Sequence, residues 1–348
     1  PPYKKLPAKA PETQAMRQIC YGAPNLYALF TAMSLFELGE DGEMVFIIPR
    51  SWASGAYFQK FREYLFQNSR IEQIHLFHYR DKVFQEQQVL QETMILKLVK
   101  KPAMNRNITI TASDSNQGFD KKTRILVPTA NIIRGTDRHM LLPTSQDDVE
   151  GIEMVNRWKE TLPSIGMKMK TGLTIGFRNR ELLSDQPSKD TVPLYYCRHI
   201  QNGIVRFPDR RGVEYLIAQK KGLLQKNQNY LFLKRFTTKE EAKRLQCGIY
   251  LSSIHPELEW ISTDNKLNFI DRMEGSLTKE QVFGLYVLFN SSLYDRYYRI
   301  LDGSTQVNAT EMNQIPVPPL NVIESLGRSL LARGDLSVEA CDELMEDL

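Results

Sequence analysis

Short apolar segments that alternate with helical patterns constrain the fold of this chain more than any other feature. Residues 43–49 (EMVFIIP) have the length and composition of a strand buried in a parallel sheet, and residues 71–77 (IEQIHLF) read as a second strand. Residues 25–42 and 53–69 carry apolar side chains at helical spacing, and residues 92–101 read as a third strand. This order predicts an α/β fold, namely one half of a doubly wound sheet.

The pattern changes after this region. We expect a first domain over residues 1–103, a connecting segment with strand-like pieces over 104–149, and a mixed α+β domain over 150–348. Asn202-Gly203 between two alternating segments predicts a β-hairpin. Two capping boxes, Thr238–Glu241 and Thr278–Gln281, each predict the start of a helix, the second over the apolar stretch that ends near Leu301.

The net charge of +4 is distributed unevenly. Residues 151–250 contain 19 Lys and Arg against 9 Asp and Glu, whereas residues 251–348 contain 7 against 16. A basic block of this size is typical of a surface that binds a polyanion such as nucleic acid. The alternative is a solvated face whose charge is balanced in the fold by the acidic stretch.

Other compositional features exclude several classes of protein. The four cysteines are far apart and form no C-x-x-C pair, which indicates free thiols in a reducing compartment, hence a cytoplasmic protein. No apolar run approaches the roughly 18 residues of a membrane span. His75 and His78 do not fall on one face of a strand and have no evident third ligand, so no metal site is expected.

The chain opens on Pro1, Pro2 and Tyr3, just ahead of the α/β region. Prolines stiffen the backbone, so that the Pro1 carbonyl is held in one direction. A following aromatic ring can stack on a nucleobase that has been flipped out of a duplex. Pro1-Pro2-Tyr3 resembles the motif of the amino-methyltransferases that act on DNA. The resemblance implies that a polar acceptor before the prolines and the Pro1 carbonyl together hold the amine of adenine near its transition-state geometry.

This motif and the segments after it, through VFQEQQVLQETMILKLVKK, resemble the gamma-class (TaqI-like) N6-adenine DNA methyltransferases of restriction–modification systems. The resemblance continues through MKMKTGLTIGF and LFNSSLYDRYYRILDGSTQVNATEMNQIPVPP, and thus covers nearly the whole chain. It implies that residues 1–103 are the C-terminal half of a Rossmann-like catalytic domain and that residues 150–348 are a target-recognition domain.

The resemblance also implies a chemistry. A methyl group would pass from S-adenosylmethionine to N6 of a flipped adenine, with Pro1, Pro2 and Tyr3 as the catalytic motif. Tyr3 and Phe84 would stack on the base, although Phe84 could equally be a core residue. The glycine-rich loop for the cofactor lies upstream of the motif in this class, so we expect most of that site outside residues 1–348, and no methylation by this chain alone.

Duplex DNA is the expected partner, and the missing N-terminal part or a restriction subunit are further candidates. Lys168 and Lys170 share one face if their segment is a strand, and Arg178 and Arg180 follow at the same period. The full set of expected DNA contacts is Lys4, Lys5, Arg50, Lys168, Lys170, Arg178, Arg180, Arg198, Lys234, Arg235, Ser304 and Thr305.

Alternatives remain open at this point. A non-catalytic DNA-specificity module would bind DNA without chemistry. Related motifs also serve methylation of N4 of cytosine, of RNA and of protein amides, and the residue before Pro1 that would separate the DNA bases is not in the sequence. The acidic C-terminal stretch reads as one or two amphipathic helices that pack on the protein or contact a partner.

Overall fold

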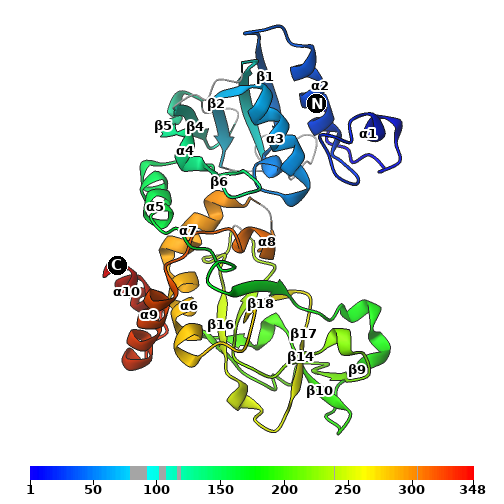
Figure 1. The fold of residues 1–348 in the computed structure, drawn as a ribbon, viewed down its shortest axis with the longest axis vertical. Helices are drawn as coiled ribbons and strands as arrows, with labels where there is room; N and C mark the ends of the chain where they lie inside the picture. Colours follow the sequence, from blue (N-terminus) through cyan, green and yellow to red (C-terminus); the bar gives the residue numbers. More distant parts are fainter. Residues whose placement is uncertain (79–91, 102–106, 116–118, 239, 304) are drawn as a thin grey trace. The chain divides into compact units, whose positions relative to one another are not determined.

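The computed structural model describes residues 1–348 apart from residues 79–91, 102–106, 116–118, 239 and 304. The chain divides into two compact units. The first contains residues 1–156 and 299–303, and the second contains residues 157–298 and 304–348 (Figure 1). Both units combine helices with sheets, in agreement with the expected mixed α/β class.

The first unit is built on a five-stranded mixed sheet. Its strands are β1 (Glu43–Pro49), β2 (Arg70–Phe77), β3 (Thr93–Val99), β4 (Asn107–Ser113) and β5 (Thr123–Pro128). They lie in the order β1-β3-β2-β4-β5, so that β1 and β5 are the edge strands. β3 is antiparallel to both of its neighbours, whereas β2 and β4 are parallel.

Helices α2 (Leu26–Glu37) and α3 (Gln59–Asn68) form where the apolar spacing predicts them. α2 packs on β1 and on α3, and α3 packs on β2. The buried positions follow the helical period, with Leu29 and Leu35 on α2 and Phe61 and Leu65 on α3. The other elements of the unit are α1 (Pro11–Ala15), α4 (Thr129–Ile132), β6 (Ile133–Arg134), β7 (His139–Met140) and α5 (Gln146–Asn156).

The structure departs from the sequence-based expectation at two places in this unit. Residues 104–149, expected as a connecting segment, contribute β4 and β5 to the sheet, and the unit continues to Asn156. β1, whose composition suggests a parallel sheet, is instead an edge strand that pairs antiparallel with β3. The first difference arises because β4 pairs with the other edge of β2, and the second because β3 returns between β1 and β2. No local sequence pattern records either of these long-range pairings.

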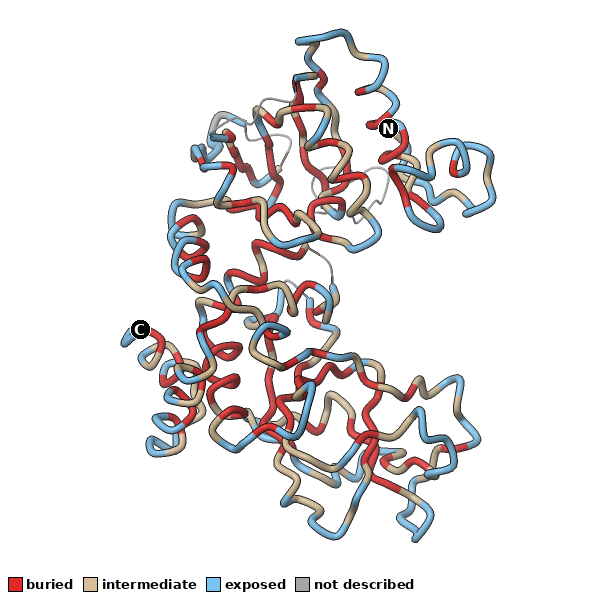
Figure 2. Tube along the Cα trace, in the orientation of Figure 1, coloured by how far each residue is buried: buried red, intermediate tan, exposed pale blue. Residues whose placement is uncertain are grey.

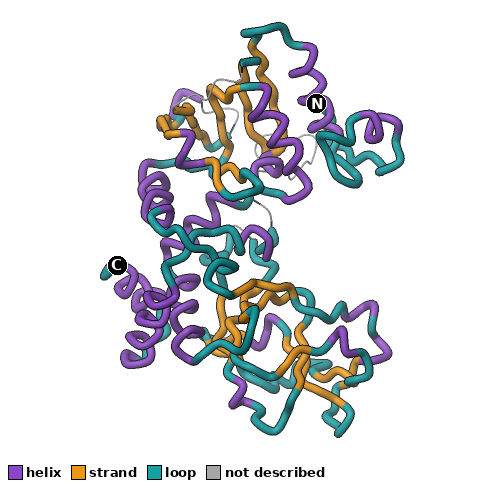
Figure 3. The backbone as a smooth tube through the Cα atoms, in the orientation of Figure 1, coloured by secondary structure: helices purple, strands orange, loops and turns teal. Residues whose placement is uncertain are grey.

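Two sheets share the core of the second unit (Figure 3). One has the order β14-β17-β10-β13-β9 and the other β11-β12-β16-β15-β18-β8. Tyr195 and Ile261 of the five-stranded sheet pack in one cluster with Phe232, Tyr250 and Phe269 of the six-stranded sheet. The strands are β8 (Met167–Thr171), β9 (Leu183–Ser184), β10 (Thr191–Tyr195), β11 (Ile200–Gln201), β12 (Ile204–Val205), β13 (Tyr215–Ile217), β14 (Gln225–Lys226), β15 (Tyr230–Lys234), β16 (Cys247–Tyr250), β17 (Trp260–Thr263) and β18 (Leu267–Arg272).

The hairpin prediction is confirmed. Ile200 pairs with Val205 and Gln201 with Ile204 in an antiparallel ladder. Asn202 and Gly203 connect the two strands with φ values of 50° and 79°, as a type I′ turn requires.

The capping box at Thr278 is also confirmed, but the helix after it is shorter than expected. Thr278 Oγ1 accepts a hydrogen bond from the Gln281 N–H, and Gln281 Oε1 accepts one from the Thr278 N–H. α6 (Lys279–Asn290) then ends at Ser291, whose ψ of 152° is extended. The Ser291 hydroxyl accepts from the Tyr294 N–H and so starts α7 (Ser292–Leu301).

The helix predicted after Thr238 does not form within the described residues. Glu241 Oε1 accepts from the Thr238 N–H at 2.7 Å, as in a capping box. The N–H groups of Arg244 and Leu245, however, donate to the Asp295 carboxylate at 2.7 and 2.8 Å. This tertiary interaction with α7 uses donors that a helix would have bonded internally, and the chain continues into β16 instead.

The acidic C-terminal stretch folds against α6. Its helices are α9 (Leu320–Arg333) and α10 (Val338–Glu346), which follow the short α8 (Ala309–Met312). α9 and α10 each contact α6, which is buried along most of its length, and they leave their outer sides exposed (Figure 2). Of the two roles left open by the sequence, packing on the protein is the one observed.

Candidate functional site

Tyr3 of the Pro-Pro-Tyr motif lies beside β1. Its hydroxyl donates a hydrogen bond to the carbonyl oxygen of Ile47 at 3.3 Å. Its ring meets the ring of Tyr27 edge to face, with 6.2 Å between the centroids. Burial raises the pKa of the Tyr3 hydroxyl, so this group remains a protonated donor at neutral pH. Pro1 is half-buried and Pro2 is exposed.

Backbone pairing holds the segment that follows the motif. The Leu26 N–H donates to the Lys4 carbonyl at 2.7 Å, and the Leu6 N–H donates to the Pro24 carbonyl at 2.9 Å. The side chains of Lys4 and Lys5 remain exposed beside this pairing. The structure therefore leaves both lysines accessible to an anionic partner.

Three rings form an aromatic cluster in the first unit: Tyr3, Tyr27 and Phe58. The rings of Tyr27 and Phe58 are stacked, with centroids 5.8 Å apart and an interplanar angle of 29°. The Tyr27 hydroxyl shares a hydrogen bond of 3.2 Å with Ser51 Oγ. The sequence does not predict Tyr27 or Phe58 as site residues, because each fits a helical apolar pattern and nothing local connects it to Tyr3.

Arg50, expected among the DNA contacts, is engaged within the first unit. Its guanidinium donates to the Ile300 carbonyl at 2.8 Å and lies 3.6 Å from the Glu92 carboxylate. The side chain is only 13% exposed. These contacts give Arg50 a structural role, and we do not assign it to the interface.

Two expected site residues, Phe84 and Ser304, lie outside the described residues. Thr305, the neighbour of Ser304, is exposed, and its carbonyl accepts from the Thr237 N–H at 3.2 Å.

Strand β8 presents two lysines on one face, as its alternation predicts. Met167 and Met169 are buried, whereas Lys168 and Lys170 are exposed. Lys170 Nζ forms an ion pair of 2.7 Å with Asp271 Oδ2 on the adjacent β18. The Lys168 side chain is exposed on this edge strand and is therefore accessible to a partner.

Arg178 and Arg180 lie just beyond β8 but not on a strand. They belong to two short 3₁₀ turns, Gly176–Arg178 and Arg180–Leu182, and both side chains are exposed. Phe177 beside them is 69% exposed. An exposed aromatic ring next to arginines is a group that nucleic-acid interfaces use for stacking. No local sequence pattern predicts Phe177 as a site residue.

Three other expected DNA contacts are less available. Arg198 donates to the Val213 carbonyl at 2.8 Å, and its guanidinium lies over the Tyr196 ring. Arg235 donates to the Asn265 carbonyl at 2.9 Å and to Gln306 Oε1 at 3.3 Å. Lys234 is half-buried at the end of β15. An arginine next to a hairpin or at a strand end can hold a loop in place as readily as it can contact DNA. The hydrogen bonds of Arg198 and Arg235 give both side chains this anchoring role.

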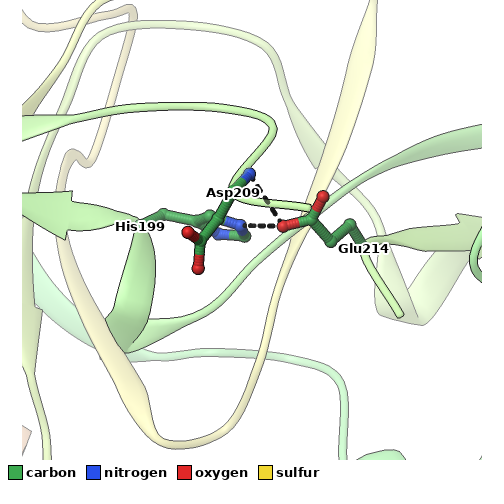
Figure 4. A group of neighbouring side chains, drawn as sticks. All are labelled: His199, Asp209 and Glu214. Atoms are coloured by element: carbon green, nitrogen blue, oxygen red, sulfur yellow. Dashed lines mark hydrogen bonds and ion pairs between the residues drawn. The ribbon is translucent and has the colours of Figure 1, made fainter. Parts of the chain in front are cut away.

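Within the described residues, one group of side chains brings three possible metal ligands together: His199, Asp209 and Glu214 (Figure 4). His199 Nδ1 accepts from the Tyr196 N–H at 2.9 Å, and Nε2 therefore carries a proton and donates to Glu214 Oε1 at 2.8 Å. Both ring nitrogens are occupied, so the imidazole has no lone pair to offer a metal.

Glu214 is similarly occupied. Its carboxylate accepts from the N–H groups of Asp209 and Arg210 at 2.9 and 3.0 Å. Burial lowers the pKa of His199 and keeps the ring neutral. Burial acts to raise the pKa of Glu214, but its hydrogen bonds outweigh this and lower it. The group is an internal network that anchors the loop between β12 and β13.

Comparison with known proteins shows what the chain is similar to. Residues 1–84 match the Eco57I restriction-modification methylase family. The Type II methyltransferase M.BsuBI of Bacillus subtilis is 31% identical over 333 residues, which cover 94% of this chain and 66% of that protein. M.PstI of Providencia stuartii, also a Type II methyltransferase, is 30% identical over 95% of this chain and 66% of its own length. The chain is thus similar to Type II methyltransferases along nearly its whole length and to a restriction-modification methylase family over its first 84 residues.

This relationship extends through both units, but the chain spans only 66% of the length of these two relatives. The region that matches the methylase family includes the Pro-Pro-Tyr motif, β1 and α3. The fold is also similar to that of the Type IIL restriction-modification enzyme MmeI, with a TM-score of 0.52 at 10% identity over 93% of this chain and 49% of that one. No helix of the described residues is both long enough and apolar enough to cross a bilayer.

Proposed function

We propose that this chain is the base-binding and target-recognition part of an S-adenosylmethionine-dependent DNA methyltransferase that modifies N6 of adenine. The observation that carries the proposal is the similarity to a Type II methyltransferase over 94% of the chain. The match to the methylase family over residues 1–84, which include the Pro-Pro-Tyr motif, supports it. MmeI, which has a similar fold, was solved in complex with DNA, which favours DNA as the partner.

In this proposal the motif handles the base. The Pro1 carbonyl accepts a hydrogen bond from the adenine amine and favours the tetrahedral geometry that the nitrogen reaches in the transition state. Tyr3 stacks on the flipped base. Its hydrogen bond to Ile47 and its edge contact with Tyr27 fix the ring, so that little side-chain freedom is lost when the base arrives.

The cofactor would supply the methyl group, but the described residues do not fit its site. The sequence Thr171–Gly176 contains two glycines, yet a Cβ at Gly172 would overlap the backbone carbonyl of Asp264. Gly172 thus serves close packing between β8 and the strand connection at Asp264, and its turn opens no long helix. We therefore expect most of the cofactor site on a segment outside this chain.

The free edge of β1 is where such a segment would join. β1 has a neighbour on only one side in the described sheet. α2, which packs on β1, exposes Phe30, Met33 and Phe36 by 48%, 47% and 67%. A helix that is apolar on more than one side is typical of an element covered by further structure. A strand added at β1 with its following helix would cover both features.

A labelled methyl-transfer assay tests the proposal. The chain alone and a version extended upstream to the length of its relatives are incubated with S-adenosylmethionine and mixed-sequence duplex DNA, and the nucleosides are then analysed. We expect N6-methyladenine from the extended protein only. Modified cytosine would move the activity to N4, and no product from either protein, together with retained DNA binding, would favour a non-catalytic specificity module.

A further inference from the structure

The second unit contains a groove whose lining residues play no part in the proposed catalytic motif. It encloses about 640 Å³ and is lined from both sheets. Lys170, Asp271 and Arg272 contribute from the six-stranded sheet, and Lys226 and Trp260 contribute from the five-stranded sheet. Its size lies within the range of small-molecule sites, about 300–1,000 Å³.

The groove carries positive charge that its one acidic side chain does not neutralise. Asp271 is already used, because Oδ2 accepts from Lys170 Nζ and Oδ1 accepts from Gln228 Nε2, each at 2.7 Å. Across the described residues, neither Lys226 nor Arg272 has a carboxylate partner, and Arg272 Nη1 is buried without a hydrogen bond. These two cations are therefore available to an anion that enters the groove.

An aromatic surface lies next to this charge. Lys226 and Trp260 are directly opposite each other in the β14–β17 ladder, so their Cβ atoms are neighbours. Trp260 is half-buried and offers the accessible ring, whereas Tyr230 and Phe269, which also border the groove, are buried in the core. A flat π surface beside a cation is suited to a ligand that combines a planar ring with a phosphate.

We propose that this groove binds an unpaired nucleotide, with the phosphate on Lys226 and Arg272 and the base against Trp260. The choice of a nucleotide among anionic ligands rests on the proposed function, which makes DNA the partner. Lys170 connects the two, because it lines the groove and is also one of the two exposed lysines of β8 that are expected to contact DNA. The shared chemistry fits a free mononucleotide and a nucleotide unit of DNA alike, and the experiment separates the two.

Tryptophan emission of the whole chain is the direct probe. Thymidylate, thymidine, a short oligothymidylate and a matched duplex are titrated separately at low salt. We expect quenching by the oligothymidylate, weaker quenching by thymidylate, and little by thymidine, which lacks the phosphate. The chain has three tryptophans, and Trp260→Phe should remove the part of the quenching that comes from Trp260. Loss of a base stack corresponds to about a five- to 150-fold weaker affinity, which Trp260→Ala should show.

Charge variants give a second readout. Lys226→Ala should lower the slope of log K against log salt for oligothymidylate by about 0.7, as expected for one lost phosphate contact on a single strand. Lys189→Ala, an exposed lysine outside the groove, removes the same charge and is the control. Thermal unfolding confirms that each variant is folded.

The outcomes separate this inference from the proposed function. Normal duplex binding without any quenching that depends on Trp260 would overturn the groove proposal and leave the methyltransferase proposal intact. Binding of thymidylate that depends on Lys226, in a protein that produces no methylated base even when extended, would uphold the groove and overturn the methyltransferase. Equal losses with Lys189→Ala and Lys226→Ala would also overturn the groove proposal, because they would indicate a diffuse charge effect.

Discussion

Gly327 of α9 lies against the main-chain carbonyl of Glu280 of α6 so closely that a Cβ at Gly327 would overlap the oxygen. Gly284 of α6 has the same relationship with the carbonyl of Ile323 on α9. The two glycines thus let the helices approach backbone to backbone. This crossing attaches the acidic C-terminal stretch to the second unit.

Gly327→Ala should destabilise the second unit. Backbone atoms cannot rotate away as a side chain can, so the helices must separate, and we expect a loss of roughly 1–3 kcal/mol in the free energy of unfolding. Urea unfolding measures it. Gly222→Ala is the control, since its Cβ meets open space, and its effect should stay within about 1 kcal/mol. Equal effects of the two substitutions would contradict the close crossing.

Tyr3 should contribute to catalysis through its ring more than through its hydroxyl. In the extended protein, we expect Tyr3→Phe to keep most of the methyl-transfer rate, because only the hydrogen bond to Ile47 is lost. Tyr3→Ala should reduce kcat/KM by about five- to 150-fold, the range for one lost base stack. If Tyr3→Phe were as inactive as Tyr3→Ala, the stacking role would be wrong.

Substitutions of exposed cations should change the salt dependence of DNA binding, whereas substitution of a cation that is hydrogen-bonded within the fold should change stability. Lys168→Ala and Arg180→Ala should each lower the salt slope of duplex binding by about 0.9 with little change in stability. Arg235→Ala should instead lower the unfolding temperature, since it removes the donors to Asn265 and Gln306. An unchanged slope for both exposed variants would exclude β8 and its following turns from the DNA surface.

The His199–Glu214 network should make the second unit less stable in acid. The folded-state pKa of His199 is lowered from 6.5, so the unfolded chain takes up a proton first as the pH falls below that value. The pKa of Glu214 is lowered from 4.5, and its contribution is lost at still lower pH. Both effects have the same sign, and stability should fall as the pH decreases from about 7 to about 4.

Urea unfolding across this pH range provides the measurement. His199→Gln should cost roughly 1–3 kcal/mol at neutral pH, because Glu214 loses a buried partner, and should flatten the acid dependence between about pH 7 and pH 5. His78→Gln, at an exposed position, is the matched control. An unchanged pH profile in His199→Gln would show that other groups carry the acid sensitivity.

Local sequence patterns were sufficient for elements whose stability comes from near neighbours. The helices α2 and α3, the strands β1 to β3, the Asn202-Gly203 hairpin and the capped start of α6 all formed as predicted. In each case, apolar spacing or a side chain within a few residues specifies the conformation. The alternation that exposes Lys168 and Lys170 belongs to the same class.

Only the tertiary structure determined the contacts between residues that are distant in the sequence. Only the strand order shows that β3 separates β1 from β2 and that β4 and β5 complete the sheet. A capping box at Thr238 opened no helix, because Asp295, some fifty residues away in the chain, binds the next donors. Arg50, Arg198 and Arg235 carry the same charge as Lys168, but carbonyl acceptors from other segments bind them. Charge is a property of the residue, whereas its availability to DNA depends on which acceptors the fold brings within hydrogen-bond distance.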